Sequence, residues 1–147
     1  DDRDQMPSAG RFLRGAWLEA SDTEFCAEQG SEAAAAAGYT DWRGAYHHRK
    51  VHLVDGKITV LDSVKGFSNR AVLRWRLQPG AWTLSHSILR GNGITLAISS
   101  DVEITRMELV EGWESRYYLE KTELPVLEVE VQKAGSITTK IQIENQA

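Results

Sequence analysis

Val51–Leu61 reads Val-His-Leu-Val-Asp-Gly-Lys-Ile-Thr-Val-Leu, with two β-branched and aliphatic runs on either side of an Asp-Gly pair. Residues of this kind favour extended backbone. Asp55 and Gly56 both tolerate a positive φ, which the two central positions of a type I′ turn require. The stretch therefore predicts an antiparallel β-hairpin that turns at Asp55-Gly56.

The chain on either side of this hairpin, from Tyr46 onward, keeps a two-residue period. Further alternating runs cover 71–77, 82–88, 94–98, 102–109, 126–131 and 137–143. Short runs bounded by turn signals, with no 3.6-residue period between them, indicate an all-β antiparallel β-sandwich. We expect it to extend from about Phe12 to Ile143. Its expected core includes Leu73, Trp75, Leu77, Trp82, Leu84, Leu96, Ile98, Val129 and Ile141.

The N-terminal third is ambiguous. The alanines from Ala33 to Ala37 favour a helix by propensity alone. The run is short, however, and Gly30 and Gly38 bound it, so an isolated helix would be marginal. We predict a strand here, and a second extended segment at 12–20.

Length and charge limit the function. The 147 residues make one domain, and the net charge is -4. Nucleic acid and anionic membranes need a concentrated basic face, so neither is expected as a partner. The charge also argues against avid binding of a polyanionic sugar, although a local arginine cluster can outweigh it. Cys26 is the one cysteine, so no disulfide forms within the chain.

No motif for catalysis or metal binding stands out. Structural and catalytic zinc sites need three or four ligands, and the histidines His47, His48, His52 and His86 have no Cys or Asp at ligand spacing. On a strand, His48 and His52 share one face and His47 takes the other. Glu128 and Glu130 share a strand face, which we interpret as a solvated sheet surface rather than a glycosidase dyad. We therefore predict no catalytic residue, no metal site and no cofactor in this chain.

Aromatic residues are the better candidates for contact with a ligand. Trp75 and Trp82 occupy alternating apolar positions, which favours the core. The aromatic residues near turns or among polar neighbours suit an exposed surface that meets a glycan or another domain; they are Trp42, Tyr46, Trp113, Tyr117 and Tyr118.

Three short motifs resemble the heparinase II/III-like family. They are Gly38-Tyr39, the strand Tyr46–Val51 with His48-Arg49, and the strand Ile58–Val64 with Asp62 before a turn at Gly66. The run 72–77 followed by Pro79 resembles the family's next strand. The resemblance covers nearly the whole chain, supports a strand at Ala33–Ala37, and adds His48 and Arg49 to the carbohydrate-contact candidates Trp42, Tyr46 and Trp113.

The resemblance implies a bacterial lyase that cleaves uronic-acid polysaccharides by β-elimination, with an α/α toroid joined to β-sheet domains. In that family the toroid and the first part of the sandwich supply the catalytic groups and, in several members, a structural zinc. The family's His-x-His-x-Asp and His-Asn-Thr segments are missing here. No catalytic or zinc residue can therefore be transferred to this chain.

We expect residues 1–147 to form a non-catalytic C-terminal sandwich segment that braces the toroid and upstream strands of a larger protein and contacts acidic polysaccharide. A free-standing carbohydrate-binding module and an independent small enzyme are the alternatives. The compartment, periplasmic or cytoplasmic, stays open. If strands upstream are missing, the weakly charged stretch Ala33–Tyr39 would lie at an exposed edge and support a weak homodimer, unless the N-terminal residues fold over that edge.

Overall fold

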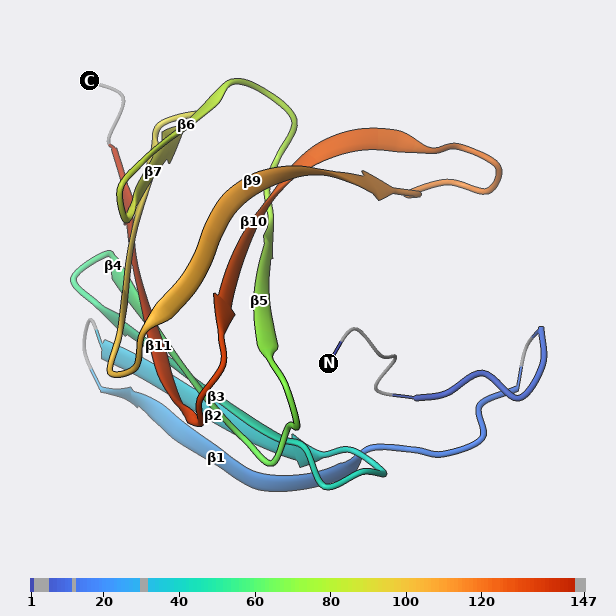
Figure 1. Ribbon diagram of the computed structural model, residues 1–147. Helices are drawn as coiled ribbons and strands as arrows, with labels where there is room; N and C mark the ends of the chain where they lie inside the picture. Colours follow the sequence, from blue (N-terminus) through green and yellow to red (C-terminus); the bar gives the residue numbers. More distant parts are fainter. Residues whose placement is uncertain (2–5, 12, 30–31, 145–147) are drawn as a thin grey trace.

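Two antiparallel β-sheets pack face to face in the computed structural model, which describes residues 1, 6–11, 13–29 and 32–144 and, of these, no side chains at 25–29 (Figure 1). The described residues contain strands and no helix, and none of them forms a helix that could cross a membrane. The all-β sandwich expected from the sequence is confirmed. The strands are β1 (Glu19–Gln29), β2 (Glu32–Thr40), β3 (Tyr46–Val54), β4 (Lys57–Lys65), β5 (Ala71–Arg76), β6 (Trp82–Ser85), β7 (Ile88–Gly91), β8 (Ile94–Ser100), β9 (Ile104–Glu114), β10 (Thr122–Val131) and β11 (Gly135–Ile143).

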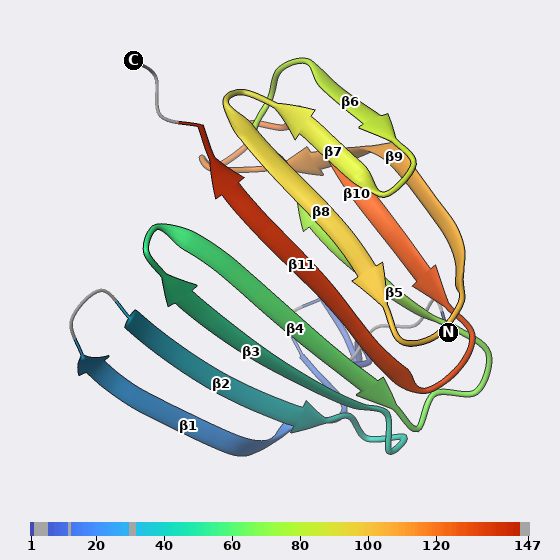
Figure 2. The same ribbon diagram turned by 90° about the vertical axis from the view of Figure 1, so that its left-hand side faces the viewer.

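The larger sheet has eight strands in the order β1-β2-β3-β4-β11-β8-β7-β6, and the smaller has three in the order β5-β10-β9. Figure 2 shows the larger sheet face-on, with the smaller sheet behind it. Most neighbours are joined by hairpins. β11 instead returns from the smaller sheet to pair with both β4 and β8. This return strand links the two halves of the larger sheet.

The hairpin at Asp55-Gly56 is confirmed. The two residues have φ values of 48° and 74°, as a type I′ turn requires, and they connect β3 to β4. Asn92 and Gly93, at 50° and 71°, form the same kind of turn between β7 and β8. These two turns set the registers of both hairpins.

The alanine run is also a strand, as predicted. Ala33–Ala37 lie within β2, which pairs with β1 on one side and β3 on the other. Hydrogen bonds to two neighbouring strands outweigh the helical preference of alanine. The expectation that Ala33–Tyr39 lies at an open edge is wrong, because β1 covers it; this is the alternative in which the N-terminal residues fold over the edge.

The predicted extended segment at 12–20 is not a strand, except at Glu19 and Ala20 where β1 begins. Phe12 lies outside the described residues. The part before β1 folds back on itself instead: Ser8 and Arg14 form an isolated bridge, and the Gly15 amide donates to the Pro7 carbonyl at 2.8 Å. The sandwich therefore starts near Glu19.

The core lies between the smaller sheet and β4, β11, β8, β7 and β6 of the larger one. Leu89, Leu127, Val129 and Val131 are wholly buried there. Of the predicted core, Leu77, Leu96, Ile98 and Val129 are buried, while the others are half-buried against them; these are Leu73, Trp75, Trp82, Leu84 and Ile141. No described side chain from β1, β2 or β3 belongs to this core. The inner face of those three strands extends past the smaller sheet, as Figure 1 shows.

Candidate functional site

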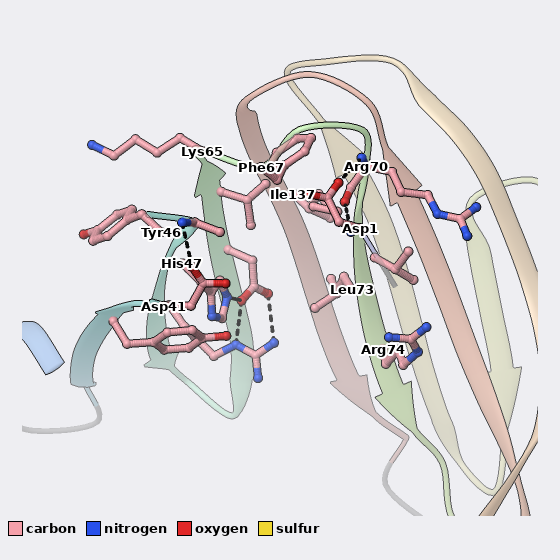
Figure 3. Close-up of a pocket in the computed structure, with 17 residues that line it drawn as sticks. Asp1, Asp41, Tyr46, His47, Lys65, Phe67, Arg70, Leu73, Arg74 and Ile137 are labelled. Carbon is pink, nitrogen blue, oxygen red and sulfur yellow. Dashed lines mark hydrogen bonds and ion pairs between the residues drawn. The ribbon is translucent and has the colours of Figure 1, made fainter. Parts of the chain in front are cut away.

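A cavity of about 650 Å³ opens where the smaller sheet ends above the larger one. One wall is β5, an edge strand of the smaller sheet, and the floor is the inner face of β3 and β4. The volume falls within the range of small-molecule sites, about 300–1,000 Å³. Figure 3 shows His47 on one side of this cavity and Leu73 on the other.

A buried carboxylate holds the floor together. Asp62 on β4 is 1% exposed and lies opposite Arg49 in the β3–β4 register. Its Oδ1 accepts hydrogen bonds from His47 Nε2 and from Arg49 Nε, both at 2.7 Å, and its Oδ2 accepts one from Arg49 Nη2 at 3.1 Å. An ionised carboxylate only accepts hydrogen bonds, so the imidazole donates its Nε2–H to Asp62.

Burial by itself would raise the pKa of Asp62. The hydrogen bonds from His47 and Arg49, together with their charge, outweigh burial and hold the pKa of Asp62 below its ordinary value. The carboxylate is therefore charged at neutral pH. It fixes the orientation of the His47 and Arg49 side chains.

Arg49 is constrained on a second side. Its guanidinium carbon lies 5.0 Å from the centroid of the Trp75 ring, and the Trp75 indole N–H donates to Thr139 at 3.1 Å. The indole is thereby anchored to β11, and it covers one face of the guanidinium. The Arg49 side chain remains 37% exposed, toward the cavity that it lines.

Aromatic and apolar groups complete the walls. The Tyr39 ring meets the His47 ring edge-on, with centroids 5.4 Å apart. Burial is the first cause that raises the pKa of the Tyr39 hydroxyl, so the hydroxyl keeps its proton at neutral pH. Phe67 and Leu73 line the opposite wall (Figure 3).

A second cluster lies on the outer face of β3. The Tyr46 hydroxyl donates to Asp22 at 2.6 Å, and the His48 ring stacks parallel to the Tyr46 ring with centroids 6.5 Å apart. The hydrogen bond is the main cause that lowers the pKa of Asp22 and raises the pKa of Tyr46. Lys65 lies 4.7 Å from the Tyr46 ring centroid, and in Figure 3 both side chains point away from the cavity.

The structure thus separates the five carbohydrate-contact candidates. Arg49 faces the cavity, Tyr46 lies at its rim, and His48 is on the opposite face of β3. Trp42 is exposed in the turn after β2, where Arg43 covers its ring. Trp113 is near the tip of the β9–β10 hairpin beside Lys121, on a different part of the molecule.

Sequence reasoning missed three residues of the cavity. Tyr39 and Asp62 appeared only as parts of family motifs, and His47 only as one of four histidines. The signal that unites them is the register, in which Tyr39 pairs with His47 and Arg49 pairs with Asp62. That register follows from the Asp55-Gly56 turn, so a residue-by-residue count back from the turn would have found the β3–β4 pair.

Glu128 and Glu130 do not form a simple solvated face, and that interpretation is wrong for Glu130, which is 5% exposed. Arg70 and Arg106 fold over it, each donating at 3.2 Å, while Arg74 and Arg106 donate to Glu128. Desolvation would raise the pKa of both carboxyls, but the hydrogen bonds and charges of the arginines lower it. The arrangement is an ion-pair network on the outside of the smaller sheet.

The remaining histidines lie apart from the cavity. His52 bonds Glu32 at 2.6 Å, on the same face of β3 as His48, and His86 occupies the β6–β7 turn with a φ of 53°. Within the described residues no three His, Cys, Asp or Glu side chains gather as metal ligands would. The Cys26 side chain lies outside the described ones.

The same fold occurs in solved lyases. The heparinase III product of the BT4657 gene matches with a TM-score of 0.74 and 18% identity over 84% of this chain and 21% of its own. The heparan sulfate lyase HepC from Pedobacter heparinus matches with a TM-score of 0.69 and 17% identity over 87% of this chain and 22% of its own. This chain thus spans about a fifth of their length. No curated protein matches it.

Residues 1–143 match the family model described as heparinase II/III-like, C-terminal. The motifs that carry the resemblance in the sequence place Tyr39, Arg49 and Asp62 around one cavity. By the extent of that match, this chain belongs to the heparinase II/III-like C-terminal family.

Proposed function

We propose that this chain serves as the C-terminal β-sandwich of a larger polysaccharide lyase, where it braces the catalytic toroid and lines one wall of the substrate cleft without supplying the catalytic groups. Its substrate would be a uronic-acid polysaccharide cleaved by β-elimination. The family match and the similar fold of heparan sulfate lyases about five times as long support this role.

The inner face of β2 and β3, which no described residue covers, is the observation that carries the proposal. Ala35 and Ala37 are exposed there, and Leu53 is 37% exposed, on the same side as the cavity. A sheet normally buries its apolar face against another layer. The smaller sheet stops at β5, so a neighbouring domain or strand would supply the missing layer and meet the cavity as it does so.

The first test is a lyase assay on this chain alone. We expect no formation of the unsaturated uronate product with heparan sulfate or alginate. The β-elimination needs a base for the proton beside the uronate carboxyl and an acid for the leaving oxygen, and we propose that the toroid and upstream sandwich supply these groups. Turnover that survives purification and disappears in His48→Ala or His47→Ala would contradict the proposal and make this chain an enzyme.

A free-standing carbohydrate-binding module is the second candidate. The exposed aromatic residues Trp42, Trp113, Tyr117 and Tyr118 favour it, since such rings stack on sugars. A glycan array separates the two functions. Retention of uronate polymers with micromolar affinity supports a module, whereas an array without retained glycans supports the bracing role. A single cleft subsite binds too weakly, at about 1 mM, to be retained.

A further inference from the structure

The Arg49 guanidinium is held so that one of its edges faces the cavity. Asp62 accepts from Nε and from one N–H of Nη2, and the Trp75 ring covers one face of the planar guanidinium. Among the described residues, the Arg49 guanidinium has hydrogen bonds to Asp62 alone. The rest of its N–H groups, including both on Nη1, are therefore available at the exposed side of the side chain.

Such an edge fits a planar carboxylate. A guanidinium presents parallel N–H groups at the spacing of carboxylate oxygens, which gives bidentate binding with geometric selectivity. Because Asp62 and Trp75 already fix the side chain, little rotamer entropy remains to be lost when a ligand binds. His47, which lies beside Arg49 on the same carboxylate, offers its Nδ1 edge as a further polar contact.

The acidic groups around the cavity are engaged elsewhere. One oxygen of Asp41 accepts from the amides of Arg43 and Ala45 at 2.8 and 2.9 Å. Asp1 accepts from three amides in the connection just before β5, those of Ser68, Asn69 and Arg70. Asp62 is buried beneath Arg49. Hydrogen bonds hold each of these carboxylates in place, and none of Asp41, Asp1 or Asp62 occupies the remaining N–H groups of the guanidinium.

The walls suit a sugar ring. Tyr39 and Phe67 offer aromatic surfaces, and Leu73 adds apolar area from β5. A pyranose has an apolar face of C–H groups and a polar rim, which this mixture of walls complements. The cavity is open to solvent beside the inner face of β2 and β3, which no described residue covers.

We propose that this cavity is a subsite that binds the carboxylate of one hexuronate unit through the edge of Arg49, with the sugar ring against Tyr39 and Phe67. The inference rests on the proposed function, because it identifies the polymer contact of the cleft wall. Arg49 and Tyr39 act here as binding residues. A sulfate could use the same donors, so the test must separate the two anions.

The test is an NMR titration of the wild-type 147-residue chain with three ligands. They are an unsulfated tetrasaccharide of glucuronate and N-acetylglucosamine, the same tetrasaccharide with its carboxyls reduced to hydroxymethyl groups, and a neutral tetrasaccharide that carries one sulfate. We expect the first to bind at about 1 mM and to shift the Arg49 Nε–H signal and the amides of 39, 47 and 73. The other two should bind at least about tenfold more weakly.

Variants locate the contact. Arg49→Lys keeps the charge and loses the planar edge, and it should weaken uronate binding about tenfold. Arg90→Lys is the matched control on the exposed part of β7 and should leave binding unchanged. If Arg49→Lys fails to fold, Tyr39→Phe is the second variant, because it keeps the aromatic ring and preserves the fold. It should weaken uronate binding by a few fold, because it removes the hydroxyl.

Three results would overturn the subsite: no shift of the Arg49 signal at about 10 mM ligand, equal binding of the reduced tetrasaccharide, or stronger binding of the sulfated one. None of them affects the bracing role, which fails through turnover by the isolated chain. Failure of the subsite and failure of the proposed function are therefore distinguishable.

Discussion

The Asp62 carboxylate is the shared partner of two side chains on β3, His47 and Arg49. It is 1% exposed and accepts hydrogen bonds from both of these half-buried side chains. Both partners keep some contact with water, since the His47 and Arg49 side chains are 26% and 37% exposed. The loss of the carboxylate therefore leaves two partly desolvated donors without their acceptor.

We expect Asp62→Asn to lower the free energy of unfolding by about 2–3 kcal/mol, somewhat less than removal of one partner from a fully buried pair. Urea denaturation followed by tryptophan fluorescence measures it. Asp55→Asn is the matched control, because asparagine also suits the first position of the type I′ turn and should change stability little. An equal effect of the two substitutions would show that the buried cluster contributes no more than a surface carboxylate.

Asp62 should also make the free energy of unfolding depend on pH in the acid range. The pKa of folded Asp62 lies below its ordinary value of 3.8, so the carboxylate stabilises the folded state fully above that value and loses this contribution as pH falls through the folded pKa. The difference in unfolding free energy between wild type and Asp62→Asn should shrink as pH falls below about 4. Glu128 and Glu130 also have lowered pKa values, but they occur in both proteins and cancel in the difference. A difference that stays constant down to about pH 2 would refute the assignment.

At the scale of the strands, β9 and β10 form a long hairpin, and its two strands approach closely at Gly112. A Cβ at this position would overlap the Val126 Cγ2 methyl and approach the Leu124 side chain at 3.4 Å. Val126 is 5% exposed, so it has little room to move. The glycine is thus required by packing rather than by its backbone angles.

Gly112→Ala should therefore lower the free energy of unfolding by about 1–3 kcal/mol through overpacking. The double variant Gly112→Ala/Val126→Ala tests this reason, because removal of the valine methyls creates space for the new Cβ. The double variant should be more stable than the sum of the two single changes predicts. Strict additivity in thermal and urea denaturation would mean that the two positions do not touch.

The strands also show what the sequence could predict. The Asp-Gly turn and the two-residue alternation follow from local backbone preferences, and they predicted most strands correctly. The run 82–88 is an exception, because a turn at His86 divides it between β6 and the start of β7. Ala33–Ala37 needed tertiary context, since only pairing with β1 and β3 makes an alanine run extended. The segment at 12–20 failed for the converse reason: its alternation suggested a strand, but only its last residues find a partner.

The cavity was less predictable than the strands, because it depends on which side chains meet across registers and between sheets. Arg49 was a candidate on its own, but its meaning comes from Asp62 opposite it and from Trp75 on the other sheet. Glu130 was misjudged in the same way. Its neighbours Arg70 and Arg106 lie 60 and 24 residues away in the sequence, where no local pattern reveals them.

For the whole molecule, the imbalance between eight strands and three is the main physical feature. The inner face of β2 and β3 carries Ala35, Ala37 and Leu53 without a covering layer among the described residues. β2 itself has no open edge, because β1 and β3 pair with its two sides, so association through the backbone of β2 is excluded. Two copies of this chain can instead associate through the apolar inner face of β2 and β3.

We therefore predict that the chain self-associates weakly, at concentrations on the order of 100 µM, through the inner face of β2 and β3. Sedimentation velocity across a concentration series should show a sedimentation coefficient that rises with concentration. Ala35→Lys places a charge in the middle of this face and should abolish the rise without lowering stability, since the residue is exposed. Ala81→Lys, an exposed alanine in the connection between β5 and β6, is the matched control and should leave the rise intact. A monomer at every concentration, or an equal effect of both lysines, would show that water covers the β2–β3 face in the isolated chain and that its apolar area is too small to hold two copies together.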